Sequence, residues 1–271
     1  MKKFFLVGAL LFTATYRSEA QSIKPKDKDQ PLQEVFQTEL VYPQEKGEFQ
    51  LTFGSRFSRG ADQRSNDIPT RLEYGITEKW QVEVEWNANS RFRPAPLAET
   101  ENGVGDVGIS TKYSFLNIRG SNFHSAVSFE AEFPTGDIDK GLTEGFIEYR
   151  PSVSFARDFP GLNRLQIFSE TGVALKQRVK RSKEIEDDES DAHEIFVNGG
   201  FFLPFKQASF VGEINWNTNQ WNKSGITSEV YLTPGFIYKL PGKWEVGFGV
   251  PIGVSRDADK YRTILQAVFE F

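Results

Sequence analysis

The chain ends on the stretch ILQAVFEF, residues 264–271, in which apolar and polar residues alternate. One face of this stretch and of the residues before it carries apolar side chains: Tyr261, Leu265, Ala267, Phe269 and Phe271. The other face carries Arg262, Gln266 and Glu270. Alternation with a period of two is typical of a β-strand. Because chain ends fray and an exposed terminal phenyl ring gains little free energy in water, the pattern indicates a last strand that lies against an apolar medium.

The opposite end of the sequence has the features of a secretory signal. Lys2 and Lys3 precede the apolar run at residues 4–16, and the small residues Ser18 and Ala20 stand at the usual cleavage spacing. The apolar run is shorter than the roughly 20 residues that a spanning helix needs. We therefore expect residues 1–20 to be a cleaved signal peptide rather than a membrane anchor.

The composition excludes several classes of protein. Every later apolar run is interrupted by charged or amide residues, which excludes a helical membrane protein. The absence of cysteine excludes a disulfide scaffold and a thiolate metal site, and the net charge of -5 disfavours a nucleic-acid partner. The 25 Phe residues occur within a chain that is only 38% hydrophobic, and they alternate with charged or small residues. This composition suits strands with one face in lipid and the other in water.

Alternating stretches recur about twelve times and predict about twelve strands of roughly ten residues each. They occupy residues 47–58, 70–76, 80–86, 106–115, 123–133, 145–155, 164–176, 194–205, 208–217, 228–240, 243–254 and 261–271. Long and short connections alternate between them, as in outer-membrane barrels with long external loops and short periplasmic turns.

We therefore predict an all-β fold, a transmembrane antiparallel up-and-down β-barrel of about 12 strands formed by residues 47–271. Closure matters because every backbone amide in hydrocarbon must find a partner within the sheet. A soluble sandwich or lipocalin-like barrel would also alternate, but its polar face would be denser than one that contains Gly54, Gly108 and Ser128. Residues 21–46 are predicted to be a flexible periplasmic lead-in, and whether they enter the lumen stays open. The expected location is the outer membrane of a Gram-negative cell, with outer-membrane lipid around a monomer.

Several short motifs resemble one family of outer-membrane transporters, the MetA-pathway-of-phenol-degradation family. The shared features are a G-x-G-D strand start, a K-Y pair, a P-T-G at the end of the next strand and a late G-x-x-Y hairpin. They correspond here to Gly103, Gly105, Asp106, Lys112, Tyr113, Pro134, Thr135, Gly136, Gly235 and Tyr238. The resemblance implies a barrel that transports small, hydrophobic or aromatic compounds.

The inward face of the predicted strands is rich in charged residues. We expect the lumen to be lined by Arg56, Arg71, Glu73, Glu83, Glu85, Lys112, Glu130, Glu132, Glu148, Arg150, Glu170, Lys176, Glu213, Glu229 and Arg262. Many of these can pair across neighbouring strands. A bore of about twelve strands is narrow, and its surplus of carboxylates favours cations.

Two other functions stay open. An outer-membrane hydrolase could use His193 beside Asp188 and Asp191, because an Asp/His pair can activate water, although a solvated loop histidine is the simpler interpretation. A plugged structural or adhesive barrel is the second alternative. His124 is interpreted as a structural lumen histidine.

No cofactor and no metal are expected. The acidic run at residues 184–191 lacks the turn glycine and ligand spacing of a calcium loop, and GVGDVG at 103–108 has no strand-to-helix context for phosphate binding.

The last strand also predicts a partner. A terminal strand that ends on Phe271, with Phe269 two residues before it, resembles the signal by which barrel-assembly machinery recognises its substrates. We therefore expect these two residues to form an assembly signal.

Overall fold

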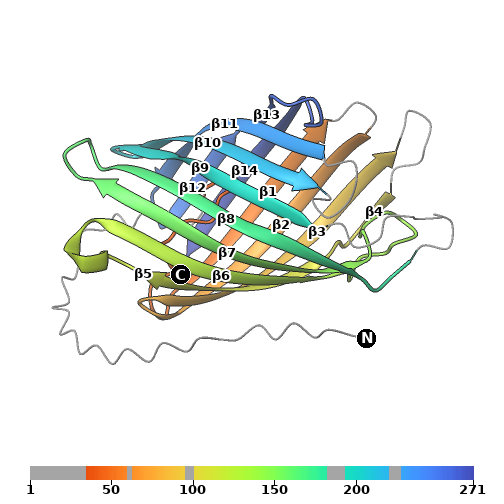
Figure 1. Ribbon diagram of the computed structural model, residues 1–271, viewed down its shortest axis with the longest axis horizontal. Helices are drawn as coiled ribbons and strands as arrows, with labels where there is room; N and C mark the ends of the chain where they lie inside the picture. Colours follow the sequence, from red (N-terminus) through yellow and green to blue (C-terminus); the bar gives the residue numbers. More distant parts are fainter. Residues whose placement is uncertain (1–34, 60–62, 95–100, 182–192, 220–226) are drawn as a thin grey trace, which may run out of the picture. The chain divides into compact units, whose positions relative to one another are not determined.

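The computed structural model describes residues 35–59, 63–94, 101–181, 193–219 and 227–271 (Figure 1). All of them belong to one unit, Leu32–Phe271. None of the helices in this part of the chain is long and apolar enough to cross a membrane.

Twelve long strands form the wall, and two short strands extend it. The long strands are β1 (Phe49–Arg59), β2 (Gln63–Thr77), β3 (Trp80–Pro94), β5 (Val107–Phe115), β6 (Phe123–Phe133), β7 (Phe146–Phe159), β8 (Leu165–Arg178), β9 (Glu194–Phe205), β10 (Ala208–Asn219), β11 (Thr227–Leu240), β12 (Trp244–Gly249) and β14 (Tyr261–Glu270). The short strands are β4 (Glu101–Gly103), which pairs with β3, and β13 (Ile252–Gly253), which pairs with β11 and β14. A 3-10 turn, η1 (Ile118–Gly120), lies between β5 and β6.

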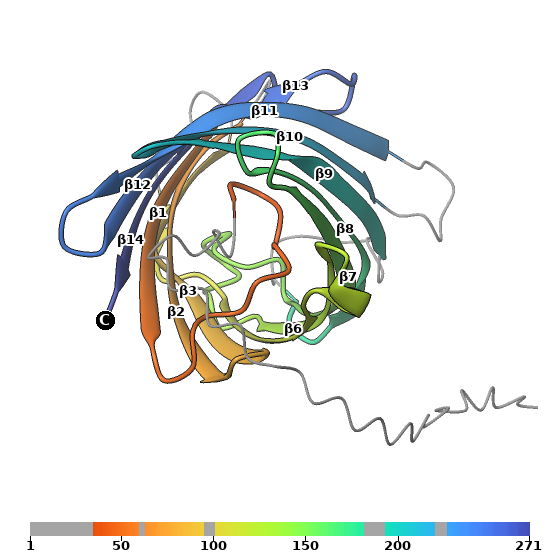
Figure 2. The ribbon, with the colours of Figure 1, turned by 90° about the vertical axis from the view of Figure 1, so that its left-hand side faces the viewer.

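Each long strand pairs with its neighbour in sequence, and the last strand closes the sheet on the first. β1 and β14 are antiparallel from Gln50↔Glu270 to Arg59↔Tyr261. The prediction of a closed antiparallel barrel of about twelve strands is therefore confirmed, and Figure 2 shows the ring of strands end on. Closure leaves no unpaired sheet edge among these strands, as a bilayer requires.

The outer face of the barrel is apolar and the inner face is polar. On β6, for example, Phe123, Val127 and Phe129 are exposed, whereas His124 and Ala126 are buried. The same alternation continues around the wall, with Phe53, Ile109, Phe201, Phe210 and Leu265 on the outside. Because successive residues of a strand point to opposite faces, this pattern lets one sheet contact lipid and line a polar lumen.

Three strands extend well beyond their predicted bounds. β2 begins at Gln63 instead of 70, β3 reaches Pro94 instead of 86, and β7 reaches Phe159 instead of 155. The sequence prediction followed the apolar face and stopped where that face ends. Backbone pairing does not need apolar side chains, so the hairpins continue beyond the lipid-facing part.

The sequence leaves open whether residues 21–46 enter the lumen, and for the part that the structure describes the answer is that they do. Residues 35–44 lie within the ring of strands, where Figure 2 shows them in red to orange, and Val35, Phe36, Leu40 and Val41 are at most 1% exposed. Side chains of the barrel strands form hydrogen bonds to this stretch. The sequence pattern does not reveal these partners. We call residues 35–44 the lumen segment.

Candidate functional site

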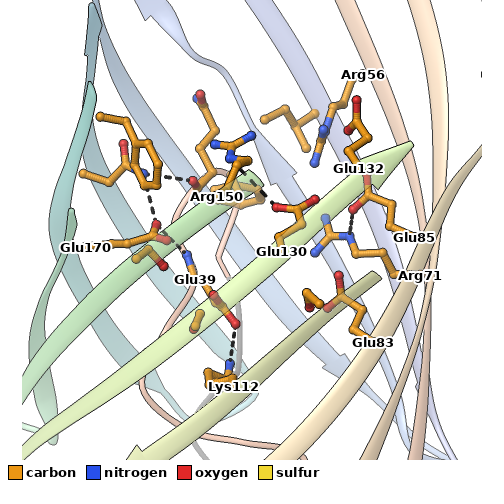
Figure 3. A pocket seen from close by; sticks show the side chains of 18 of the residues that line it. Glu39, Arg56, Arg71, Glu83, Glu85, Lys112, Glu130, Glu132, Arg150 and Glu170 are labelled. Carbon is orange, nitrogen blue, oxygen red and sulfur yellow. Dashed lines mark hydrogen bonds and ion pairs between the residues drawn. The ribbon is translucent and has the colours of Figure 1, made fainter. Parts of the chain in front are cut away.

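A cavity of about 560 Å³ lies in the lumen beside the lumen segment. Phe36, Gln37 and Glu39 of the segment form part of its lining, and inward-facing residues of the barrel strands form the rest (Figure 3). The cavity is the candidate functional site because so many charged side chains meet there.

Eleven of the fifteen residues that were predicted for the lumen line this cavity: Arg56, Arg71, Glu73, Glu83, Glu85, Lys112, Glu130, Glu132, Arg150, Glu170 and Arg262. The other four lie on the same inner face through their contacts. Glu148 lies 3.5 Å from Arg150 and 3.5 Å from Lys176, Glu229 lies 3.6 Å from Arg262, and Glu213 accepts a hydrogen bond from the backbone of Gln37.

Most charges in the cavity are paired. Arg71 Nε lies 2.8 Å from Glu85 Oε2, and both come from the β2–β3 hairpin, where they are cross-strand partners. Arg150 Nε lies 3.9 Å from Glu130 Oε2 on the neighbouring strand β6. These pairs follow directly from the register, since residues opposite one another in antiparallel strands have adjacent side chains.

Three charged groups of the lining have no hydrogen bond and no ion pair within the described part of the chain: Arg56, Glu83 and Glu132. Glu83 belongs to β3 and Glu132 to β6, and the inward residues of β5 between them are Gly108 and Ser110. Arg56 belongs to β1. The cavity therefore offers unpaired charges of both signs.

The barrel holds the lumen segment mainly through its backbone. Carboxylate and amide oxygens of the wall accept from backbone N–H groups: Glu213 from Gln37, Glu170 from Glu39 and Gln81 from Gln44. Wall side chains also donate to backbone carbonyls: Asn198 to Gln37, Ser154 to Glu39, Lys112 to Leu40 and Ser114 to Val41. These contacts satisfy backbone groups that a strand would otherwise pair within a sheet.

Phe36 anchors the segment in a recess of the wall. A Cβ atom at Gly235 would lie 2.2 Å from Phe36 Cε2, and one at Gly249 would lie 2.7 Å from Phe36 Cγ. Both positions therefore need glycine for the ring to pack against the sheet. In the sequence Gly235 stands out only through its family motif, which gives no sign of this packing role.

A second cluster fixes the other end of the segment. The Tyr42 hydroxyl donates to Asp158 Oδ2 over 2.7 Å, and His124 Nε2 lies 3.1 Å from the same oxygen. Gln166 donates to Asp158 Oδ1 over 2.7 Å. Burial, and then the neighbouring Asp158 carboxylate, raise the pKa of the Tyr42 hydroxyl. The cluster is structural in character, which agrees with the interpretation of His124 as a lumen histidine, although the sequence did not reveal its partner Asp158.

The structure gives only part of the environment of the other histidine. His193 Nδ1 accepts a hydrogen bond from the backbone N–H of Lys176 over 3.3 Å. Asp188, Asp191 and the rest of the acidic run at 184–191 lie outside the described residues. In the described part of the chain, no group of three or more His, Cys, Asp or Glu residues is arranged to hold a metal ion.

The C-terminal phenylalanines close the barrel at its seam. Backbone hydrogen bonds of 2.9 Å run in both directions between Phe271 and Phe49. The Phe271 ring stacks on Phe49 and on Phe269, and Phe269 stacks on Trp244 with a centroid distance of 4.7 Å. The pair expected to signal assembly thus lies in one aromatic cluster on the outer surface.

Comparison with known families supports the resemblance drawn from the motifs. The family described as "Putative MetA-pathway of phenol degradation" matches residues 46–271. The chain belongs to this family. Among curated proteins, none matches the sequence.

Several motif residues of the family hold one loop against the barrel. Asp106 Oδ1 accepts from the backbone N–H of Gly136 over 3.0 Å, and Oδ2 accepts from the Thr143 hydroxyl over 2.8 Å. Thr135 donates to the carbonyl of Gly105 over 2.9 Å. The G-x-G-D and P-T-G motifs therefore meet in space, and together they shape the loop at 134–143. Burial raises the pKa of the Asp106 carboxyl, although its hydrogen bonds to Gly136 and Thr143 act in the opposite direction.

Solved structures share the architecture at low sequence identity. The COG4313 outer membrane channel from Pseudomonas putida F1 is similar with a TM-score of 0.67 and 10% identity, over 85% of this chain and 98% of the channel. The KdgM porin has a TM-score of 0.54 and 12% identity, over 81% of this chain and 99% of the porin. The NanC porin has a TM-score of 0.53 and 12% identity, over 81% and 97%. At these identities the likeness shows the fold alone, which is that of an outer-membrane β-barrel.

Proposed function

We propose that the protein is an outer-membrane channel for small polar solutes, closed by the lumen segment and open when that segment moves. The observation that carries the proposal is a lumen cavity of about 560 Å³ with a charged lining, one side of which is formed by the segment itself. The similar solved barrels are channels and porins, which adds support at the level of the fold.

The charged lining favours a polar solute over the hydrophobic or aromatic one that the family resemblance implied. An apolar solute in this cavity would displace water from carboxylate and guanidinium groups without replacing their hydrogen bonds, which costs free energy. A polar solute replaces those bonds. The polar class is therefore the better fit to the cavity, and an enzymatic role is not part of the proposal.

The contacts of the lumen segment suit a closure that can be reversed. Most of them are hydrogen bonds between wall side chains and the segment backbone, and water can make the same bonds when the segment leaves. Each exchanged bond changes the free energy by only about 0.5–1.5 kcal/mol. The burial of Phe36 and Leu40 opposes release and keeps the closed state dominant.

A disulfide lock tests the proposal. The Thr38 hydroxyl lies 3.5 Å from Asn215 Nδ2, and the chain contains no cysteine, so Thr38→Cys with Asn215→Cys would form a single cross-link between segment and wall. We expect the oxidised protein to be silent in planar bilayers and the same protein to conduct after reduction, which makes the reduced form its own control. Equal conductance in both states would contradict closure by the segment.

The plugged structural barrel is the second candidate, and the near-complete burial of Val35, Phe36 and Val41 is the observation that favours it. In that case the reduced double variant would conduct no better than the oxidised one, and both would be silent. The hydrolase alternative has a separate test, because His193→Ala would then abolish a measured hydrolysis.

A further inference from the structure

The unpaired charges of the cavity come from strands on both sides of β2. Glu83 and Glu132 lie on the wall formed by β3, β5 and β6. Arg56 lies on β1, where its cross-strand neighbours are Ile264 on β14 and Asp67 on β2. All three line the same cavity, and none of them has an ion pair or hydrogen bond within the described residues.

The other charges of the lining already have partners. Glu85 is paired with Arg71, Glu39 with Lys112, and Glu130 lies near Arg150. Glu73 accepts hydrogen bonds from Gln50 and Gln81, and Glu170 accepts from Asn198. A solute that enters the cavity therefore meets two carboxylates and one guanidinium that have no ion pair or hydrogen bond within the described residues.

We propose that this cavity binds a small zwitterion, a solute that carries one ammonium and one carboxylate group. The ammonium group is bound by Glu132 and Glu83, and the carboxylate by the guanidinium of Arg56. This inference rests on the proposed channel function in that it names the solute class of the same cavity. Both ends of such a solute find an opposite charge, whereas a simple cation leaves Arg56 unpaired and a simple anion leaves both glutamates unpaired.

The size and lining of the cavity agree with a ligand of this kind. Its volume of about 560 Å³ lies within the range of roughly 300–1,000 Å³ that is common for small-molecule sites. Between Glu83 and Glu132, β5 presents only Gly108 and Ser110, so no long side chain of that strand separates an ammonium group from the carboxylates. Phe196 and Ile264 also contribute to the lining and offer apolar contacts to a short alkyl chain.

Four compounds with the same four-carbon frame test the proposal: 4-aminobutyrate, butylamine, butyrate and butyramide. Binding is measured by titration calorimetry on the full-length protein in detergent micelles. We expect 4-aminobutyrate to bind at least about tenfold more tightly than each of the others, the factor that one charge-assisted hydrogen bond supplies. Equal binding of 4-aminobutyrate and butyramide would overturn the proposal, and so would butylamine binding as tightly as 4-aminobutyrate.

Charge-neutralising variants assign the two ends of the ligand. Arg56→Gln should reduce the affinity for 4-aminobutyrate about tenfold, to that for butylamine, and Glu132→Gln should reduce it to that for butyrate. Lys239→Gln and Glu245→Gln are the matched controls, because this lumen pair with a separation of 3.4 Å does not line the cavity. Arg56→Lys keeps the positive charge and should keep most of the preference. Heat-modifiable migration on gels verifies that each variant is folded, and an unchanged affinity in folded Arg56→Gln would overturn the assignment.

The outcomes separate this inference from the channel proposal. If 4-aminobutyrate binds selectively but the reduced Thr38→Cys/Asn215→Cys protein passes no solute, the binding site stands and the channel function fails. If the reduced protein conducts but 4-aminobutyrate has no binding preference, the channel function stands and the zwitterion site fails.

Discussion

Lys112 Nζ lies 3.2 Å from a carboxylate oxygen of Glu39 and 3.0 Å from the backbone carbonyl of Leu40. The lysine belongs to β5, and the other two residues belong to the lumen segment, more than 70 positions earlier in the chain. Lys112 is 1% exposed. Lys112 thus binds both a side chain and the backbone of the lumen segment. It is the clearest electrostatic link between the barrel wall and this segment.

Replacing this lysine should loosen the lumen segment. Lys112→Met leaves the Glu39 carboxylate and the Leu40 carbonyl without their partner, and loss of one member of a buried pair costs roughly 3–5 kcal/mol. We expect more frequent opening events in planar-bilayer recordings. Lys239→Gln, which removes a paired lumen cation that does not touch the segment, is the control. If the two variants opened equally often, Lys112 would have no special role in closure.

The glycine recess under Phe36 gives a steric test of the same closure. Gly235→Ala places a Cβ atom 2.2 Å from Phe36 Cε2, so the ring must leave its recess and the closed state is destabilised. We expect higher basal conductance from this variant. Gly199→Ala, whose Cβ would have no neighbour closer than 3.5 Å, is the control and should behave like the unmodified protein. If neither variant changed the conductance, the packing of Phe36 against Gly235 would not control the opening of the channel.

Adjacent residues on β3 should differ strongly in how well they tolerate a positive charge. Val84 is 39% exposed on the outer face, whereas Glu83 lines the cavity. Val84→Arg should destabilise the barrel by about 2–4 kcal/mol if the site lies near the bilayer midplane, and Glu83→Arg should cost far less. Urea titration of bilayer-embedded protein measures both values. Equal tolerance of the two substitutions would contradict the lipid-facing position of Val84.

The C-terminal phenylalanine should affect assembly. Deletion of Phe271 removes the backbone bonds to Phe49 and a ring that stacks on two others, so we expect slower insertion into the membrane of living cells. The yield of heat-modifiable barrel after a pulse of synthesis measures the rate. Phe205→Ala removes a ring of similar exposure next to a two-residue turn and is the control for a general loss of aromatic surface. Normal yield after deletion of Phe271 would exclude a role in recognition.

The carboxylates of the lumen should set the ion preference of the open channel. The lining contains eight acidic and five basic residues, so we expect a small conductance with a mild preference for cations. Glu130→Gln with Glu132→Gln should lower this preference, as reversal potentials in a salt gradient would report. An anion preference in the unmodified protein would show that these carboxylates do not face the conducting path.

The period-two alternation determined much of the fold. Successive residues of a strand point to opposite faces. Phe269 and Phe271 can therefore face lipid while the charged neighbour Glu270 lies on the other face. The same rule located the lumen residues, since the inward face of each strand is fixed once its outward face is known. A local pattern suffices here because strand geometry repeats at every second residue.

Tertiary structure alone decided the rest. Residues 35–44 have no periodic pattern, and their burial depends on partners such as Glu170, Glu213 and Lys112, which lie on distant strands. Arg71 and Glu85 meet through the register of one hairpin, which is a local arrangement. Arg56, Glu83 and Glu132, in contrast, reach one cavity only because the twelve long strands form a ring. A sequence specifies which face a residue takes, but the curvature of the closed sheet decides which other residues it meets across the lumen.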